Sequence, residues 1–252
     1  MLNIDLSGKL ALVTGGSGEL GRAMVRTLAR AGADVAIHYH RNQAQAEKLQ
    51  AELLALGRRA AAVQADVTRL DTVMAMRDAV AEALGEPDII VNTSVIQYKW
   101  TRVLEQAPED YEGQFRSSVL HNVFMAKAFV PAMVKKGWGR MIAINTECAM
   151  KNTPSQSAYV SGKRGMDGVL RVLAREVGPS GITVNQVAPG WTISENKPDT
   201  EAQEEYRRNV PLRRRGTDQE IANAVAFLAS DLAGFITGVY LPVCGGNVMP
   251  AI

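Results

Sequence analysis

The sequence predicts an α/β fold, a single-domain Rossmann-type sheet that is doubly wound and parallel, with about seven strands and helices on both faces. Two observations indicate this fold class. Short apolar runs and segments with helical period follow one another along the whole chain. The runs are almost continuously apolar, as expected of parallel strands buried on both faces, and right-handed crossovers then place helices on each side.

The predicted strands are short apolar runs bounded by turn-forming or polar residues. The first run ends in Thr-Gly-Gly, and the fourth reads Asp-Ile-Ile-Val-Asn, whose apolar centre indicates a buried strand. In chain order the predicted strands are Lys9–Val13, Asp34–Tyr39, Ala60–Gln64, Asp88–Asn92, Arg140–Asn145, Ile182–Val187 and Val239–Val243.

The predicted helices are the segments between these strands in which apolar residues recur with helical spacing. The second is rich in alanine and leucine, which are strong helix formers. In chain order the helices are Leu20–Ala31, Gln43–Leu56, Leu70–Leu84, Glu109–Lys136, Ser155–Gly178 and Asp218–Ala229. No Pro/Ser-rich linker, repeat or low-complexity stretch divides the chain, so residues 1–252 are predicted to form one domain.

Residues 191–215 break the alternation of strands and helices. The segment is too long for an ordinary connection and is highly charged. We predict that it is a lid over a site at the strand ends, and a solvated surface excursion is the alternative. Its charged residues include Glu201, Glu204, Glu205, Arg207, Arg208 and Arg213–Arg215.

Composition excludes several classes of function. The net charge is +2, from 28 basic and 26 acidic residues, so no bulk field attracts nucleic acid or acidic lipid. Two cysteines make no disulfide framework, and three histidines are not spaced as a metal site. Neither a secretory signal nor an apolar run of about 20 residues is visible. We therefore expect a cytoplasmic, soluble protein without metal, membrane or nucleic-acid partners.

The turn Thr14–Gly21 joins the first strand to the first helix and reads Thr-Gly-Gly-Ser-Gly-Glu-Leu-Gly. Glycine there permits a tight turn, close approach of backbone N–H groups to phosphate, and close packing of the helix. A pyrophosphate group would then lie at the positive helix N-terminus. In this strand–turn–helix context the motif predicts a dinucleotide site.

Tyr159 and Lys163 lie four residues apart in a predicted helix, so both side chains can reach one bound molecule. Free tyrosine titrates near pH ~10. A fixed cation nearby favours the phenolate, so Tyr159 could donate or accept a proton near neutrality. The spacing alone is common on solvated helix faces, and the prediction depends on the accompanying motifs.

Taken together, the motifs resemble those of the short-chain dehydrogenases/reductases, in particular the 3-oxoacyl-[acyl-carrier-protein] reductase-like branch. The resemblance covers essentially the whole chain, and the order and spacing of its motifs make it highly specific. The matching motifs are Thr14–Gly21, Asp66-Val67, Asp88–Asn92, Tyr159–Lys163, Asn185 with Pro189-Gly190, Pro211–Gly216, Ile236–Gly238 and Gly245-Gly246.

The resemblance implies an NAD(P)-dependent oxidoreductase that interconverts a small-molecule carbonyl and a secondary alcohol by hydride transfer. Tyr159 would be the acid/base, Lys163 would hold the ribose and lower the tyrosine pKa, and Thr146 would anchor the substrate oxygen where the family has serine. A homo-oligomer, a tetramer, is implied in the same way. The implied cofactor-binding residues are Gly15, Ser17, Gly18, Leu20, Gly21, His40, Arg41, Asp66, Val67, Asn92, Thr93, Ser94, Tyr159, Lys163, Pro189, Gly190, Thr192 and Ser194.

Two departures from the family pattern lie beside the expected cofactor. Glu19 stands where the family has glycine, and its carboxylate would be repelled by pyrophosphate unless it points to solvent. Gly18, one position earlier, would then provide the close approach. Val95 follows Asn92-Thr93-Ser94 and narrows the space next to the cofactor.

A third departure concerns the supply of protons. Val119 stands at the position of an asparagine that, in the family, relays protons through water to the lysine. Because valine cannot hydrogen-bond, the relay is predicted to be absent as written, unless Asn122 or Ser118 holds the water.

The end of the second strand predicts NADP as the preferred cofactor, with NAD as the alternative. NAD-specific members have an acidic residue there for the ribose hydroxyls, whereas residues 37–42 read Ile-His-Tyr-His-Arg-Asn. Arg41, together with His40, could pair with a 2′-phosphate. If Arg41 merely faces solvent, NAD would bind adequately.

Two further hypotheses stay open. Tyr98 and Trp100 suggest an apolar or sugar-stacking wall, so a polyol, sugar or sugar-acid dehydrogenase is the alternative within the enzyme class. The departures at Glu19, Val95 and Val119 motivate a hypothesis of another class, a catalytically weak NADP-binding interaction protein.

Overall fold

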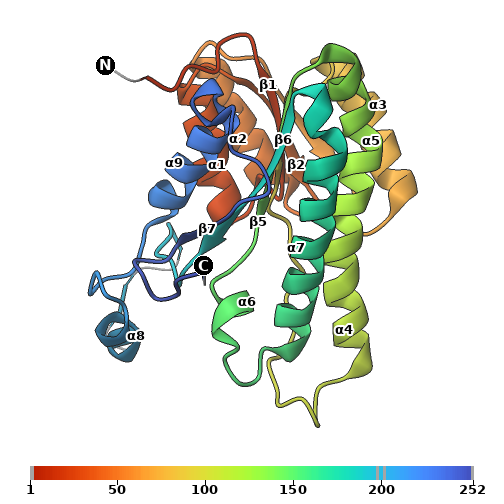
Figure 1. The fold of residues 1–252 in the computed structure, drawn as a ribbon. Helices are drawn as coiled ribbons and strands as arrows, with labels where there is room; N and C mark the ends of the chain where they lie inside the picture. Colours follow the sequence, from red (N-terminus) through yellow and green to blue (C-terminus); the bar gives the residue numbers. More distant parts are fainter. Residues whose placement is uncertain (1–2, 197–198, 201–202, 251–252) are drawn as a thin grey trace.

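The structure, a computed structural model, describes residues 3–196, 199–200 and 203–250. A parallel sheet of seven strands forms the centre of this part of the chain. Its order is β3-β2-β1-β4-β5-β6-β7 (Figure 1). The strands are β1 (Leu10–Thr14), β2 (Asp34–Tyr39), β3 (Ala60–Gln64), β4 (Ile89–Asn92), β5 (Gly139–Ile144), β6 (Ile182–Pro189) and β7 (Tyr240–Val243).

The strand order reverses direction between β1 and β4, which pair in parallel from Ala11 with Ile89 to Thr14 with Asn92. From β1 the chain builds outward through β2 to β3, and it then returns to add β4 on the other side of β1. Ligands of doubly wound sheets bind at such a switch point, outside the carboxyl ends of the strands. The predicted fold class is confirmed.

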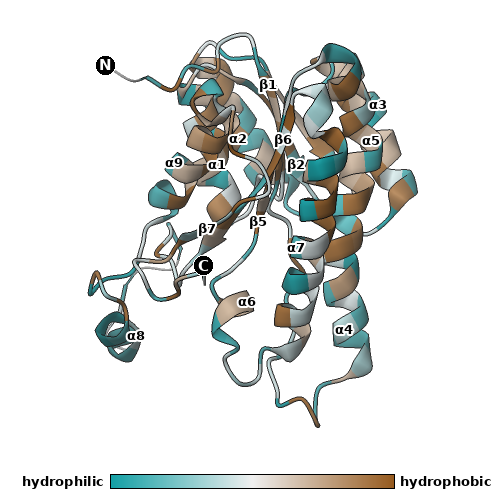
Figure 2. Cartoon of the chain, viewed as in Figure 1, coloured by the Kyte–Doolittle hydropathy of each residue, from teal (hydrophilic) through white to brown (hydrophobic). Residues whose placement is uncertain are grey.

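Helices cover both faces of the sheet, with α1, α2 and α9 on one face and α3, α5 and α7 on the other (Figure 1). Each layer encloses its own apolar core, and the central strands are largely apolar (Figure 2). The helices are α1 (Glu19–Arg30), α2 (Gln43–Ala55), α3 (Leu70–Ala83), α4 (Pro108–Gln114), α5 (His121–Lys136), α6 (Cys148–Lys151), α7 (Ser157–Val177), α8 (Glu204–Asn209) and α9 (Asp218–Ala229), with 3₁₀ turns η2 (Gly178–Ser180) and η4 (Asp231–Ala233).

The single helix predicted over Glu109–Lys136 is divided, which corrects the sequence prediction. A π-helical turn, η1 (Phe115–Leu120), separates α4 from α5 and packs against α7. The packing is close, because a Cβ atom added at Gly162 of α7 would lie 2.9 Å from the carbonyl oxygen of Gln114. π turns occur frequently at functional sites. This one faces the helix that carries Tyr159 and Lys163.

The helical stretch Pro108–Lys136 is long and apolar enough, by length and composition alone, to cross a membrane. Within the described chain, however, 56% of its apolar window is buried in the protein. Two of its side chains, Met125 and Phe129, are fully buried in the apolar core on this face of the sheet. The pattern is that of a core helix.

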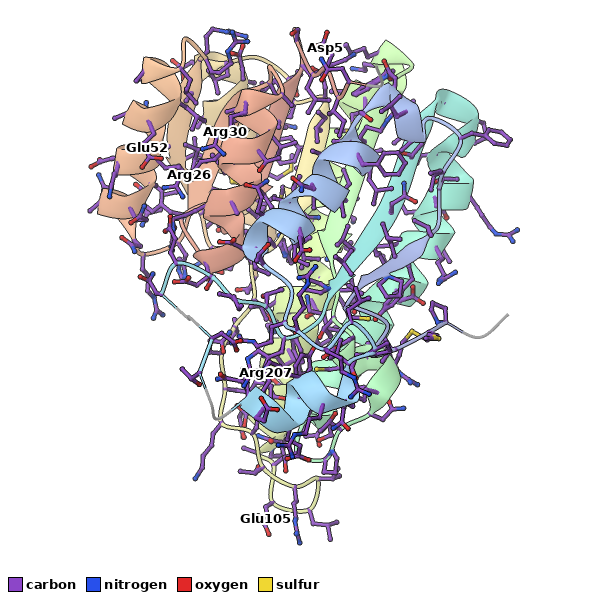
Figure 3. All side chains as sticks on the ribbon, turned by 90° about the vertical axis from the view of Figure 1, so that its left-hand side faces the viewer. Asp5, Arg26, Arg30, Glu52, Glu105 and Arg207 are labelled. Atoms are coloured by element: carbon purple, nitrogen blue, oxygen red, sulfur yellow. The ribbon has the colours of Figure 1, made fainter. Side chains whose placement is uncertain are left out.

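Residues 191–215 contain more regular structure than the predicted loop. They include α8, and an isolated bridge pairs Ile193 with Thr217. Arg215 is buried and donates to the carbonyl oxygens of Trp191 (3.1 Å) and Thr192 (2.5 Å), so the two ends of the segment are joined. Arg207 of α8 pairs with Asp199 at 2.9 Å (Figure 3). The predicted charged residue Glu201 lies outside the described residues.

Candidate active site

Two adjoining cavities lie at the carboxyl edge of the sheet. The larger is a groove of about 960 Å³ that follows the glycine turn, the end of β2 and the connection after β4. The smaller is a pocket of about 160 Å³ lined by Thr146, Tyr159 and Lys163. A ligand lying along the groove would therefore reach the pocket. The two cavities share Leu20, Thr93, Val95, Gly190 and Thr192.

The glycine turn has the geometry that its motif predicts. A Cβ atom at Gly21 would lie 2.1 Å from the carbonyl oxygen of Gly15, so only glycine lets α1 approach the turn this closely. Gly15 itself has φ +64°, in the left-handed region that favours glycine. No side chain caps the N-terminus of α1, so its first N–H groups are available to phosphate oxygens. These residues fit a dinucleotide.

His38, for which no role was predicted, fixes the start of the glycine turn. Its Nδ1 accepts a hydrogen bond from the Gly15 N–H (2.9 Å), and its Nε2 lies 3.0 Å from the Ala65 carbonyl oxygen. Because the Gly15 N–H can only donate, Nδ1 is unprotonated and Nε2 carries the proton. Burial lowers the pKa of His38 to about 4, so the ring is neutral. The sequence signal that could have indicated this role is the presence of a polar residue, His38, inside an otherwise apolar strand.

The structure brings the three predicted catalytic side chains together. Thr146 follows β5, whereas Tyr159 and Lys163 lie one turn apart near the start of α7. The Tyr159 and Thr146 hydroxyls line the same pocket, and Thr146 acts to lower the pKa of Tyr159. The Lys163 Nζ lies 5.8 Å from the centroid of the Tyr159 ring and donates to the Ile144 carbonyl oxygen at 2.6 Å.

The protonation of Tyr159 corrects one expectation. Burial raises the pKa of Tyr159 well above its usual range, and the Thr146 side chain acts against this shift without cancelling it. The expected lowering by Lys163 does not prevail, because its Nζ is directed to the Ile144 carbonyl oxygen. Burial also lowers the pKa of Lys163 to about 8. At neutral pH the phenol is therefore a proton donor, and the lysine is mostly charged.

Two aromatic residues stand beside the phenol. The Trp100 ring stacks on the Tyr159 ring, with centroids 6.3 Å apart and an interplanar angle of 23°. The Tyr98 hydroxyl accepts a hydrogen bond from the backbone N–H of Tyr159 at 2.8 Å, at the start of α7. Trp100 is half-exposed and forms an apolar rim next to the pocket.

Asn122 makes the polar contacts at the π turn. Its Nδ2 donates to the Ser118 carbonyl oxygen (2.7 Å), and its Oδ1 accepts from Asn92 Nδ2 (2.8 Å). Val119 is buried and packs against α7, where its Cγ2 lies 3.0 Å from a Cβ atom added at Gly165. Asn92 thereby connects β4 to the π turn, and its predicted contact with a cofactor stays a prediction.

The end of β2 presents the Arg41 guanidinium and the His40 imidazole to the groove. His40 and Arg41 are exposed and line it. Asn42 also lines it, and its Oδ1 caps α2 by accepting from the Gln45 N–H at 3.2 Å. No carboxylate lies in this stretch. The end of the groove therefore suits a phosphate group better than a pair of ribose hydroxyls.

Glu19 does not point to solvent, as its position in the glycine turn seemed to require. Its carboxylate accepts hydrogen bonds from Ser194 Oγ and Asn196 Nδ2, both at 2.7 Å, and lies 3.3 Å from the Arg22 guanidinium. Burial acts to raise the pKa of Glu19, but the two hydrogen bonds and the Arg22 charge outweigh it and lower the pKa to about 2. Glu19 is thus ionised and held by the protein.

A second carboxylate, Glu147, lies next to Thr146 and was not predicted as part of the site. It accepts a hydrogen bond from Asn247 Nδ2 at 2.9 Å, and the nearby Tyr206 hydroxyl acts to lower its pKa. The same hydroxyl accepts from the Trp191 N–H at 2.8 Å. Burial raises the pKa of Glu147. One carboxylate thereby joins the loop after β5, α8 and the C-terminal stretch.

All the predicted cofactor-binding residues except Asn92 line the groove or the pocket. The sequence reasoning missed several residues that line the groove as well. Ser117 of the π turn is one, and its buried Oγ has no hydrogen-bond partner among the described residues, so it is available to a ligand. The others include His38, Asn42, Thr68 and Trp191.

The fold and the two cavities define a dinucleotide-binding enzyme with a protonated phenol beside the dinucleotide groove. Comparison with known proteins identifies its family. Residues 17–247 match the family model described as enoyl-(acyl carrier protein) reductase. The 3-oxoacyl-[acyl-carrier-protein] reductase FabG of Pseudomonas aeruginosa is 37% identical over 249 residues, covering 98% of this chain and 100% of the relative. FabG of Staphylococcus aureus (strain Mu50) is 36% identical over 245 residues, covering 96% and 98%.

A solved structure agrees with these relatives. The crystal structure of a blue fluorescent protein from a metagenomic library, in complex with NADPH, matches with a TM-score of 0.91 at 35% identity, covering 97% of this chain and 100% of the other. The chain belongs to the short-chain dehydrogenase/reductase family and is similar to its 3-oxoacyl reductases. The predicted class, an NAD(P)-dependent oxidoreductase, is confirmed.

Proposed function

We propose that the protein reduces a carbonyl group of a small molecule to a secondary alcohol with NADPH. The observation that carries this proposal is that Thr146, Tyr159 and Lys163 line a small pocket opening on the nucleotide groove. The names of the bacterial relatives, which are 3-oxoacyl reductases, support a carbonyl substrate. The NADPH in the similar solved structure supports the cofactor.

The groove residues suggest how NADPH would be held. Arg41 and His40 would bind the 2′-phosphate, and Asp66 and Val67 would border the adenine. The glycine turn would take the pyrophosphate. Tyr159 and Lys163 would hold the nicotinamide ribose. Next to the nicotinamide would lie residues of the connections after β4 and β6: Thr93, Ser94, Pro189, Gly190, Thr192 and Ser194.

The chemistry divides between cofactor and protein. When bound, the cofactor supplies the hydride. The Thr146 hydroxyl donates a hydrogen bond to the substrate oxygen, and Tyr159 gives its proton to the same oxygen as negative charge develops there. The charged Lys163 stabilises the phenolate that remains. The small pocket that these side chains line holds them close together.

The protonation state of Tyr159 favours reduction of a carbonyl over oxidation of an alcohol. Reduction needs a protonated Tyr159, and burial raises the pKa of Tyr159, so the acid form is present at neutral pH. Oxidation of an alcohol needs the phenolate instead. We therefore propose that the oxidative reaction becomes appreciable only at alkaline pH.

Thermal shift with NADPH, NADP, NADH and NAD, followed by a carbonyl panel, tests the proposal. We expect the largest stabilisation with the phosphorylated cofactors and oxidation of NADPH by at least one carbonyl. Stabilisation without turnover on a broad panel would favour a binding protein. No stabilisation by any of the four would contradict both functions.

The substrate is best sought among 3-oxoacyl thioesters. The apolar rim at Trp100 and the reductases among the relatives support this class. The stacked Trp100 ring could also hold a sugar ring, which keeps polyols, sugars and sugar acids in the panel. A greater kcat/KM for an oxoacyl thioester than for every polyol, sugar or sugar acid tested would identify oxoacyl thioesters as the substrate class.

The remaining assignments belong to the same proposal. The chain would act as one dinucleotide-binding and catalytic domain over residues 1–252, with residues 191–215 as the substrate-binding lid. It would work in the cytoplasm as a homotetramer. Light scattering after size-exclusion chromatography measures the assembly directly, and a monomeric mass would contradict this part.

A further inference from the structure

A set of charged and polar contacts connects the start of α1 to residues 194–196, across the mouth of the groove. Glu19 accepts from Ser194 Oγ (2.7 Å), Asn196 Nδ2 (2.7 Å) and the Asn196 N–H (3.4 Å). We call Glu19, Arg22, Arg26 and residues 194–196 the clasp. Both sides of it line or border the groove, which Glu19 and Ser194 share.

Two arginines of α1 hold the middle of the same segment. Arg22 Nε and Arg26 Nη1 each lie 2.8 Å from one carboxylate oxygen of Glu195. Arg22 is buried, and its Nη1 also donates to the Ser17 carbonyl oxygen of the glycine turn at 3.3 Å. Arg26 is fixed from the other side by Glu52 of α2 at 2.7 Å (Figure 3). The clasp is therefore anchored to α1 and, through Glu52, to α2.

The position of Glu19 makes the clasp relevant to the cofactor. Glu19 is the first residue of α1, where the helix dipole favours a negative charge. A phosphate at the glycine turn is favoured by the same dipole and the same N–H groups. Because both would lie at the start of α1, the Glu19 carboxylate and a phosphate bound at the glycine turn would repel each other. Entry of a dinucleotide thus works against the contacts that close the mouth of the groove.

We propose that Glu19 is a positioning residue that holds residues 194–196 closed over the groove, and that this clasp opens for each exchange of cofactor. This inference rests on the proposed function, because it assumes that the groove binds NADPH. It explains why an acidic residue is compatible with a phosphate-binding turn: its carboxylate serves the segment that encloses the cofactor.

Variants on both sides of the clasp test it. Glu19→Ala removes the acceptor, Glu19→Gln keeps one acceptor oxygen without the charge, and Glu195→Gln weakens the arginine contacts. Glu47→Gln is the control, because its exposed carboxylate on α2 accepts a hydrogen bond from Gln43 Nε2 (2.7 Å) and makes none of the clasp contacts. Hydrogen exchange of the amides of residues 193–196 without cofactor, and stopped-flow NADPH association and dissociation, are measured for each.

We expect exchange at residues 193–196 to be about tenfold faster in Glu19→Ala and Glu195→Gln, as loss of charged hydrogen bonds implies. NADPH association and dissociation should both accelerate by a similar factor. Glu19→Gln should be intermediate, and Glu47→Gln should match the wild type within about twofold.

Unchanged exchange in Glu19→Ala and Glu195→Gln would overturn the clasp itself. Faster exchange with unchanged NADPH rates would overturn its role as a gate. If the wild type binds no nicotinamide nucleotide, the proposed function fails, whereas the exchange measurement still decides whether the clasp holds the segment.

Discussion

The half of the molecule that forms the glycine turn and the half that carries the proposed catalytic residues differ in regularity. From β1 to β3 the strands and helices follow one another without interruption, and positive φ angles occur only at glycine. After β4, by contrast, come the π turn and the non-glycine residues with positive φ: Asn152, Ser155 and Arg213. Among the described residues, every buried side-chain polar atom without a hydrogen-bond partner, except Arg22 Nη2, also lies after β4 begins.

The difference follows from what each half has to do. A dinucleotide is bound largely by backbone N–H groups, so a regular strand, a glycine turn and a helix N-terminus are enough. Proton transfer needs buried polar side chains at fixed positions, and such groups accept irregular backbone and incomplete hydrogen bonding. Substitutions should therefore separate cofactor binding from turnover according to the half in which they fall.

After Tyr159, the largest effect is expected at Thr146, in the irregular half. Thr146→Val has nearly the same shape but cannot hydrogen-bond the substrate oxygen, so kcat should fall about 10²-fold with NADPH affinity unchanged. Thr146→Ser restores the hydroxyl and should recover most of the rate. Steady-state kinetics and NADPH titration of both variants check this, and an equal loss in Thr146→Ser would point to packing instead.

Glu147 should affect stability more than chemistry. Glu147→Ala removes the acceptor of the Asn247 amide and the carboxylate beside the Tyr206 hydroxyl, and we expect a loss of about 2 kcal/mol in the free energy of unfolding. The substrate KM should rise because α8 is no longer held, whereas NADPH binding should not change. Urea denaturation and kinetics measure both, and an unchanged KM would remove Glu147 from the substrate side.

The sequence was sufficient for the bounds of most elements of the regular half, and it named the three side chains that the structure brings together in one pocket. Periodicity located β2 and β3 with their observed bounds, because nothing interrupts the pattern there, and it did the same for α9 in the other half. The division of the helix at Phe115 could not be predicted, since it depends on how closely α7 approaches. The contacts of Glu19 and the direction of Lys163 likewise depend on residues far away in the chain. The resemblance supplied roles that geometry alone would not give.

In the regular half, Arg41 should affect cofactor choice alone. Arg41→Ala removes a cation from the end of the groove, so the Kd for NADPH should rise about tenfold while the Kd for NADH stays constant. Arg58→Ala, also on the connections of this half but not lining the groove, is the control. Equal effects on both cofactors would show that Arg41 does not read the 2′-phosphate.

The effect furthest from the chemistry is a dependence of stability on pH. Burial lowers the pKa of Lys163 to about 8, so between pH 8 and its unfolded value near ~10.4 the unfolded chain binds more protons at this site. Stability should therefore gain a positive contribution from Lys163 as pH rises through this window, and Lys163→Met should lack it. Urea midpoints at pH 7.5 and 10, with exposed Lys135→Met as control, measure the difference. Parallel pH profiles of wild type and Lys163→Met would contradict the burial of an ammonium.

Single-turnover reduction by Tyr159→Phe tests the central claim most directly, that Tyr159 donates the proton. With saturating NADPH we expect the rate to fall about 10³-fold, whereas NADPH affinity stays close to that of the wild type. Tyr111→Phe is the matched control, since its hydroxyl bonds Ser157 Oγ at 2.7 Å on the first turn of the same helix, outside the pocket. Near-wild-type turnover in Tyr159→Phe, or an equal loss in Tyr111→Phe, would contradict the account.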